Sequence, residues 1–145
     1  MRSVLALLMA LALLVPAAET LAAPLAQLRD DGVWINPVLH GVDYTGEFTT
    51  SSQRTANGGL VDVWRFRGSS GDCARVHAQS SDIELSVQLA QSTPNGAVVT
   101  TSGAAGADGL NPTYRLPGSD TYYVKVISAN TSQPHGRYQL RLDRC

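Results

Sequence analysis

The most regular feature of the chain is an alternation of apolar and polar residues, which is typical of β-strands with one buried face. Four segments show it clearly, and we expect their apolar positions to point into a core: Leu60, Trp64 and Phe66; Ile83, Leu85, Val87 and Leu89; Tyr122, Val124 and Val126; Tyr138, Leu140 and Leu142. Weaker alternation predicts four more strands, at Gly46–Thr50, Cys73–Ala78, Ala97–Thr101 and Thr113–Leu116. The pattern therefore predicts about eight strands in all.

Short turn-forming sequences separate these segments, among them Asn57-Gly58-Gly59 and Pro117-Gly118. No segment after residue 23 sustains the 3.6-residue period of an amphipathic helix. Strands that follow one another without helices favour antiparallel pairing, and two such sheets bury their apolar faces against each other. The predicted fold class is therefore all-β, an antiparallel β-sandwich of the jelly-roll kind.

The N-terminal segment has a different pattern. Arg2 precedes an uncharged apolar run over residues 4–15, and small residues follow Pro16. The run is shorter than the roughly 20 apolar residues that a membrane-spanning helix needs, so we interpret it as a secretory signal peptide. We expect residues 1–23 to be removed and the protein to be periplasmic or secreted, with no membrane span. Residues 24–40 would then form a linker or an extra edge strand, and residues 41–145 the β-sandwich domain.

Composition and cysteine content narrow the class of protein. The 145 residues carry 11 Lys+Arg and 12 Asp+Glu, and this balance argues against a nucleic-acid binder, which needs a basic surface. In an exported protein the two cysteines, Cys73 and Cys145, most simply form a disulfide. That bond would close a long loop and contribute about 4 kcal/mol in the chain-entropy model. Free thiols or an intermolecular bridge are the alternatives.

Several tracts occur in an order that matches a known family: Gly46-Glu47-Phe48, Asp62-Val63-Trp64-Arg65-Phe66, Gly71–Val76, Asp82–Leu89, Asn95-Gly96, Pro117–Val126 and Gly136–Leu140. Together they resemble the bacterial pre-peptidase C-terminal domain, from Gly41 to Leu142. The resemblance implies a secreted β-sandwich module often appended to exported proteases, with roles in substrate adhesion or in protease secretion and maturation. Some relatives bind calcium through acid clusters, but here Thr100–Gly103 and only Asp108 follow the Asn-Gly turn. We therefore expect no metal site and no cofactor.

Residues suited to catalysis are present but are not grouped. The three histidines, His40, His77 and His135, lack the local spacing of a zinc site, and no Gly-x-Ser-x-Gly tract occurs. Asp62 shares the inward side of its strand with Trp64, and we expect it to bond backbone amides at the strand end. We therefore expect no enzyme activity. The alternative is a small exported hydrolase or metal-dependent enzyme, which requires a cleft where His40 or His77 meets acidic residues.

Basic residues recur at the outward positions of the predicted strands. They are Arg65, Arg67, Arg75, Lys125 and Arg141, with Tyr123 among them. If several share one sheet, they form a basic, partly aromatic surface that suits an acidic protein patch or a charged glycan. An ordinary solvated sheet face is the alternative.

The sequence thus predicts an exported, non-catalytic binding or accessory module for a protein or polysaccharide of unknown identity, with an exported protease as one candidate partner. A structural envelope protein without a small ligand is a further alternative.

Overall fold

The computed structural model describes residues 28–105 and 109–145, with the side chains of residues 101–105 excepted. The predicted signal peptide, residues 1–23, and Asp108 lie outside the described residues. The described chain forms ten strands: β1 Leu28–Asp30, β2 Val33–Pro37, β3 Asp43–Phe48, β4 Val61–Gly68, β5 Cys73–Gln79, β6 Leu85–Gln91, β7 Val98–Ala105, β8 Thr113–Arg115, β9 Asp120–Ser128 and β10 Gly136–Arg144. The all-β prediction is confirmed, and its expected strands correspond to β3 through β10.

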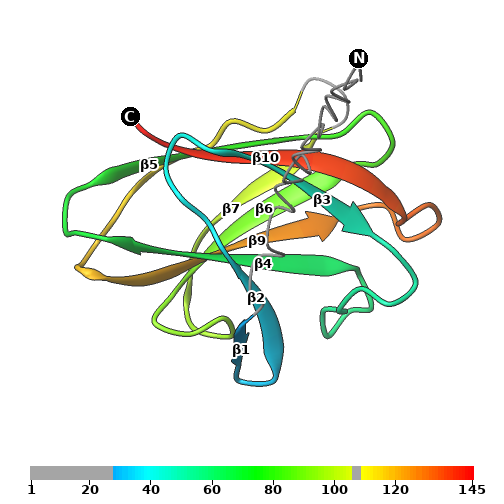
Figure 1. Ribbon diagram of the computed structural model, residues 1–145, viewed down its shortest axis with the longest axis horizontal. Helices are drawn as coiled ribbons and strands as arrows, with labels where there is room; N and C mark the ends of the chain where they lie inside the picture. The colour runs from blue at the N-terminus through cyan, green and yellow to red at the C-terminus, as the bar shows by residue number, and fades with distance from the viewer. Residues whose placement is uncertain (1–27, 106–108) are drawn as a thin grey trace, which may run out of the picture.

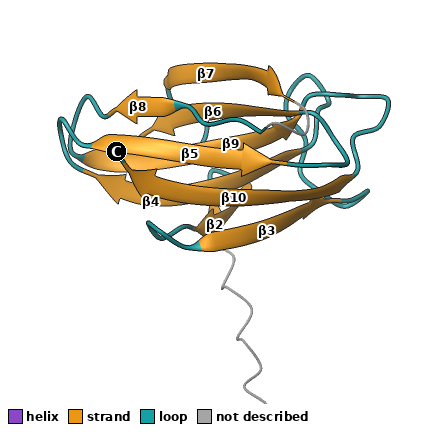
Figure 2. Cartoon of the chain, turned by 90° about the horizontal axis from the view of Figure 1, so that it is seen from above, coloured by secondary structure: helices purple, strands orange, loops and turns teal. Residues whose placement is uncertain are grey.

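The strands form two stacked sheets (Figure 1). One sheet has six strands in the order β1-β2-β4-β9-β6-β7, and the other has four in the order β3-β10-β5-β8. Figure 2 shows β8, β5, β10 and β3 side by side in one layer. From β3 to β10 every connection crosses between the sheets except the β6–β7 hairpin, which is the connectivity of a jelly roll. Every pairing is antiparallel except that of β2 with β4.

The core lies between the two sheets and consists of the residues that the alternation predicts. In β6, for example, Leu85, Val87 and Leu89 are buried while the residues between them are partly exposed. Aromatic rings join the layers, with Tyr44 of β3 lying against Trp64 of β4 at 5.1 Å between ring centroids. Each fully buried side chain of this size contributes about 1.5–3 kcal/mol relative to an exposed one, so the inward faces account for much of the stability.

Strands β1 and β2 form a hairpin that lengthens the six-stranded sheet. Its turn is Asp31-Gly32, at φ of 47° and 77°, and the left-handed backbone of an Asp-Gly pair suits a two-residue hairpin turn. Beyond the turn, β2 runs parallel to β4, with Ile35 opposite Val63. A second, smaller cluster forms around the hairpin, on the face of the sheet that turns away from the core: Ile35, Val61, Val63, Ala90 and Tyr123.

The predicted disulfide is confirmed. Cys73 begins β5 and Cys145 follows β10, and their Cα atoms lie 5.3 Å apart because these two strands are paired neighbours. The backbone N–H of Cys145 also donates to the carbonyl of Cys73 at 3.3 Å. The bond therefore joins the C-terminus to the middle of the four-stranded sheet, outside the core.

Candidate functional site

The residues of the predicted basic surface fall on two different faces of the molecule. Arg65 and Arg67 on β4 share the outer face of the six-stranded sheet with Lys125 on β9. Arg75 on β5 and Arg141 on β10 lie on the outer face of the other sheet. The alternation correctly separates inward from outward positions, but it does not say which strands share a sheet. The six residues therefore do not form one surface.

Tyr123 is buried, with only 2% of its surface exposed, so its ring is not part of an open binding surface. The hairpin of β1 and β2 covers it, and its hydroxyl donates to the Asp30 carboxylate at 2.9 Å. Burial, with a smaller effect of Asp30, raises the pKa of the Tyr123 phenol. The sequence missed this because Asp30 lies 93 residues away, in the segment before the family-like tracts.

The charges on the outer face of the four-stranded sheet are largely paired. Arg141 donates from Nε to both carboxylate oxygens of Asp143 at 3.0 Å, and its Nη1 lies 3.5 Å from Asp43. His77 Nε2 lies 3.2 Å from the same Asp143 carboxylate. The hydrogen bond from Arg141 is the main reason that the pKa of Asp143 is lowered.

The enzyme alternative required a histidine that meets an acid, and His77 does meet Asp143. The contact belongs to an ion cluster on an open sheet face, however, and among the described residues no serine or threonine hydroxyl is hydrogen-bonded to His77. His40 instead packs edge-on against Phe66, and burial lowers its pKa. Within the described ranges no three His, Cys, Asp or Glu side chains are grouped so that they could hold a metal ion.

Asp62 differs from its expected role. Its carboxylate accepts from the hydroxyl of Tyr138 at 2.6 Å, and the indole N–H of Trp64 donates to that same hydroxyl at 2.9 Å. The partner of Asp62 is therefore a side chain of the core and not a backbone amide at a strand end. Burial raises the pKa of Asp62, although the bond from Tyr138 acts in the opposite direction. The three side chains link the two sheets, because Tyr138 is on β10 and the others are on β4.

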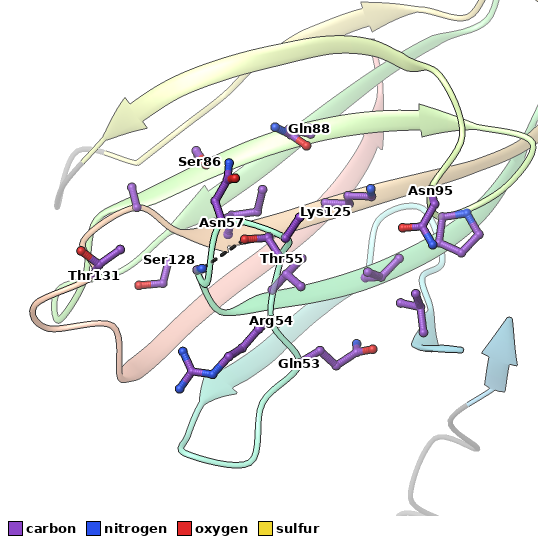
Figure 3. Close-up of a pocket in the computed structure, with 18 residues that line it drawn as sticks. Gln53, Arg54, Thr55, Asn57, Ser86, Gln88, Asn95, Lys125, Ser128 and Thr131 are labelled. Atoms are coloured by element: carbon purple, nitrogen blue, oxygen red, sulfur yellow. Dashed lines mark hydrogen bonds between the residues drawn. The ribbon is translucent and has the colours of Figure 1, made fainter. Parts of the chain in front are cut away.

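The described chain has a groove of about 520 Å³ on the outer face of the six-stranded sheet (Figure 3). Its floor comes from the outward positions of β4, β9 and β6: Val61, Val63, Lys125, Ile127, Ser86 and Gln88. Its walls come from the β3–β4 loop and from the segments that follow β6 and β9: residues 53–57, Pro94, Asn95, Ala129 and Thr131. In Figure 3, Thr131 lies at one end of the groove and Asn95 at the other, with Lys125 between them.

Hydrogen bonds fix the main wall of the groove in place. The side-chain amide of Gln53 accepts from the backbone N–H of Trp34 at 2.6 Å and donates to the carbonyl of Trp34 at 2.8 Å. The loop is also closed internally, because the Thr55 hydroxyl accepts from Gly59 N–H at 3.1 Å, the dashed line in Figure 3. The wall is thus anchored to β2, and the groove is formed before any ligand arrives.

Lys125 is the only lysine of the chain and lies half-buried on the groove floor. Val63 of β4 and Gln88 of β6 are its direct neighbours in the sheet. Within the described residues its amino group has no hydrogen bond or ion pair, and burial lowers its pKa. An ammonium group with three donors and no partner can receive an acceptor, above all an anion, from outside the protein.

The groove was only partly predictable from the sequence. Lys125 was among the predicted binding residues, but the loop residues that face it were not. One signal was present: Val61, Val63 and Ile127 are apolar at outward positions, which is unusual for a solvated sheet face. Apolar residues on both faces of β4 and β9 indicate that something covers part of the outer face.

Solved structures of known proteins have a similar fold, although sequence comparison finds no match. No protein-family model matches the chain, and no curated protein matches its sequence. A solved structure of the pre-peptidase C-terminal domain of a collagenase from Bacillus anthracis is similar, with a TM-score of 0.58 and 14% identity over 75% of this chain and 94% of that one. The predicted resemblance to that family is therefore confirmed at the level of the fold.

Two further similar structures are PliG proteins, periplasmic lysozyme inhibitors of g-type lysozyme. The Aeromonas hydrophila protein has a TM-score of 0.55 and 15% identity over 77% of this chain and 96% of its own. The Salmonella Typhimurium protein has a TM-score of 0.51 and 15% identity over 77% and 97%. Both kinds of similar structure are non-catalytic β-sandwich modules. In the described part of this chain, no helix is long and apolar enough to cross a membrane.

Proposed function

We propose that the chain is an exported, non-catalytic module that binds a protein partner through the groove on the outer face of the six-stranded sheet. The observation that carries the proposal is the groove itself, with a preformed loop wall on one side and, on its floor, an amino group that has no partner among the described residues. Pockets of about 300–1,000 Å³ are typical of ligand sites, and this one lies within that range.

Export is supported by three independent features. The first is the sequence of residues 1–23, which has the pattern of a signal peptide. The second is the disulfide between Cys73 and Cys145, since such bonds persist in oxidising compartments. The third is the fold similarity to periplasmic PliG proteins. We propose a periplasmic or secreted location on these grounds.

A protein is the favoured kind of partner, because two of the similar structures are inhibitors, and an inhibitor of lysozyme acts on a protein. A g-type lysozyme is therefore a defined partner to test, and an exported protease is the second. Polysaccharides belong in the same panel, because the sequence left them open.

The test is a binding panel measured by biolayer interferometry on the exported, disulfide-bonded protein. The panel contains a g-type lysozyme, exported proteases and polysaccharides. Ser86→Arg fills the floor of the groove, and Asn57→Trp blocks its rim from an exposed loop position. Gln139→Arg, on the exposed outer face of the other sheet, is the matched control.

We expect at least one protein of the panel to bind the wild type and the control equally, and to bind both groove variants at least tenfold more weakly. Thermal melting of each variant checks that it is folded. Protein binding that survives both groove substitutions, or binding of polysaccharides alone, would overturn the proposal.

A further inference from the structure

The charges that line the groove all have the same sign. The described lining residues include two cations, Lys125 and Arg54, and no aspartate or glutamate. The remaining polar groups are neutral amides and hydroxyls, such as Gln88, Asn95 and Thr55. Arg54 is already engaged, because its Nη1 donates to the carbonyl of Gly58 at 2.9 Å. Neither cation has a counter-charge among the described residues, but Arg54 is exposed on the loop, whereas Lys125 is half-buried on the groove floor.

The position of Lys125 is unfavourable in the free protein. Its aliphatic stem lies beside Val63 on the neighbouring strand, and the half-buried ammonium has lost part of its hydration without gaining a counter-charge from the part of the chain that the structure describes. Removing a charge from water costs free energy unless an opposite charge or hydrogen bonds replace the lost hydration. A ligand that brings an anion to this point recovers that cost, whereas a neutral ligand does not.

The groove residues around Lys125 also indicate which kind of molecule carries the anion. Val33, Val61, Val63 and Ile127 make the groove apolar around the charge, which suits the hydrocarbon part of a side chain and its neighbours. No described lining residue is aromatic, so the groove lacks the ring faces on which sugars commonly stack. The combination favours a peptide segment over a glycan.

We infer that the groove binds a protruding segment of the partner protein that carries a glutamate or aspartate, and that Lys125 forms an ion pair with this carboxylate. This inference rests on the proposed function and adds the chemistry of the partner to it. The occupant is thus an acidic side chain flanked by apolar residues, held by the amino group on the floor and by the loop of residues 53–57 at the rim.

A peptide pair tests the inference directly. The probes are acetyl-Gly-Val-Glu-Val-Gly-amide and the same peptide with Gln in place of Glu, titrated into isotope-labelled protein by NMR. We expect the Glu peptide to shift the methyl signals of Val63 and Ile127 and to saturate. The Gln peptide should bind at least tenfold more weakly. Because the chain has one lysine, reductive dimethylation with ¹³C-formaldehyde and a borohydride reductant adds a single lysine signal, and the pKa of that amine should rise when the Glu peptide binds.

Matched variants distinguish an effect of the Lys125 charge on binding from an effect on folding. Lys125→Met keeps the length of the side chain and should reduce binding of the Glu peptide to that of the Gln peptide, while its melting temperature stays equal or rises because a partly desolvated charge is removed. Arg75→Met, on the other sheet, should bind like the wild type. Equal binding of the two peptides, or tighter binding of a glucuronate oligosaccharide at the same signals, would overturn the inference.

Binding of the variants to the partner protein found in the panel distinguishes this inference from the proposed function. If Ser86→Arg abolishes binding of the partner protein and Lys125→Met does not, the groove binds a protein but the carboxylate assignment is wrong. If neither substitution weakens the partner, the groove is not the binding site and the proposed function fails as well. Loss of binding in both variants supports the proposed function and the assignment of a carboxylate to Lys125.

Discussion

At Gly46 the backbone of β3 passes directly beneath the aromatic ring of Tyr138, because the two residues face each other across β3 and β10. A Cβ atom at this position would lie 2.1 Å from the ring carbon Cζ of Tyr138. The ring cannot move away freely, since its hydroxyl is bonded to Asp62 and Trp64. The absence of a side chain at Gly46 is thus a requirement of the bridge between the sheets.

We therefore predict that Gly46→Ala lowers the free energy of unfolding by about 1–3 kcal/mol, the usual cost of overpacking. Chemical denaturation measures this value. Gly118→Ala is the control, because its Cβ would meet nothing nearer than 3.6 Å, and its effect should be small. An equal loss in both variants would show that the ring of Tyr138 is not held as described.

The buried carboxyl group of Asp62 makes the stability of the protein depend on pH. Burial raises its pKa above the unfolded value, so between the two values the folded state binds more protons than the unfolded state. Stability from this group is therefore complete below the unfolded pKa, near 4, and falls as pH rises through the folded pKa. Asp62→Asn keeps an oxygen for the Tyr138 hydroxyl and removes the charge.

We predict that Asp62→Asn is more stable than the wild type at pH 7 and that the difference disappears below about pH 4. Urea denaturation at both pH values measures it, with the exposed Glu47→Gln as the control. A variant that is less stable than the wild type at pH 7 would contradict this account, because it would mean that the ionised carboxylate stabilises the core.

The positions of the strands β3 to β10 could be predicted from the sequence, but the assignment of each strand to one of the two sheets could not. Alternation is a local property, so a segment such as β6 reports its own buried face wherever it lies. Sheet membership depends on pairings between distant residues, and neighbours in sequence such as β4 and β5 belong to different sheets. Alternation alone therefore placed Arg65 and Arg75 in one predicted surface, whereas in the structure they lie on different sheets.

The hairpin of β1 and β2 shows how an element beyond the family-like tracts shapes the site. Ile35 is fully buried against the outer face of the sheet, whereas its neighbour Trp34 is 46% exposed and contacts Arg29. A ranking by hydrophobicity or size would place tryptophan in the core. The pairing of β2 with β4 instead aligns Ile35 with Val63, so the isoleucine and not the tryptophan joins the cluster on the outer face.

From this arrangement, Ile35→Ala should lower the free energy of unfolding by about 2–5 kcal/mol, as expected for a fully buried isoleucine. Trp34→Ala should cost less than about 1 kcal/mol, because exposed substitutions change stability little. Thermal and urea denaturation of the two variants give the comparison. A larger loss for Trp34→Ala would mean that the hairpin does not pack on the outer face as described.

On the scale of the whole molecule, the groove is a product of topology. Its floor combines three strands, and its walls combine the β3–β4 loop, the β6–β7 turn and the segment after β9. These parts are separated by up to several tens of residues in the chain and meet only in the folded sheet. The sequence could therefore predict Lys125 as an outward cation, but not that it lies at the bottom of a groove.

Site-specific photocrosslinking can show whether the groove on the six-stranded sheet is the binding site. A photoreactive amino acid is placed at Asn57 on the exposed rim of the groove, or at Gln139 on the opposite sheet, and each protein is irradiated with the panel protein that it binds. We expect a covalent adduct from position 57 and none from position 139. An adduct from position 139 alone would contradict it.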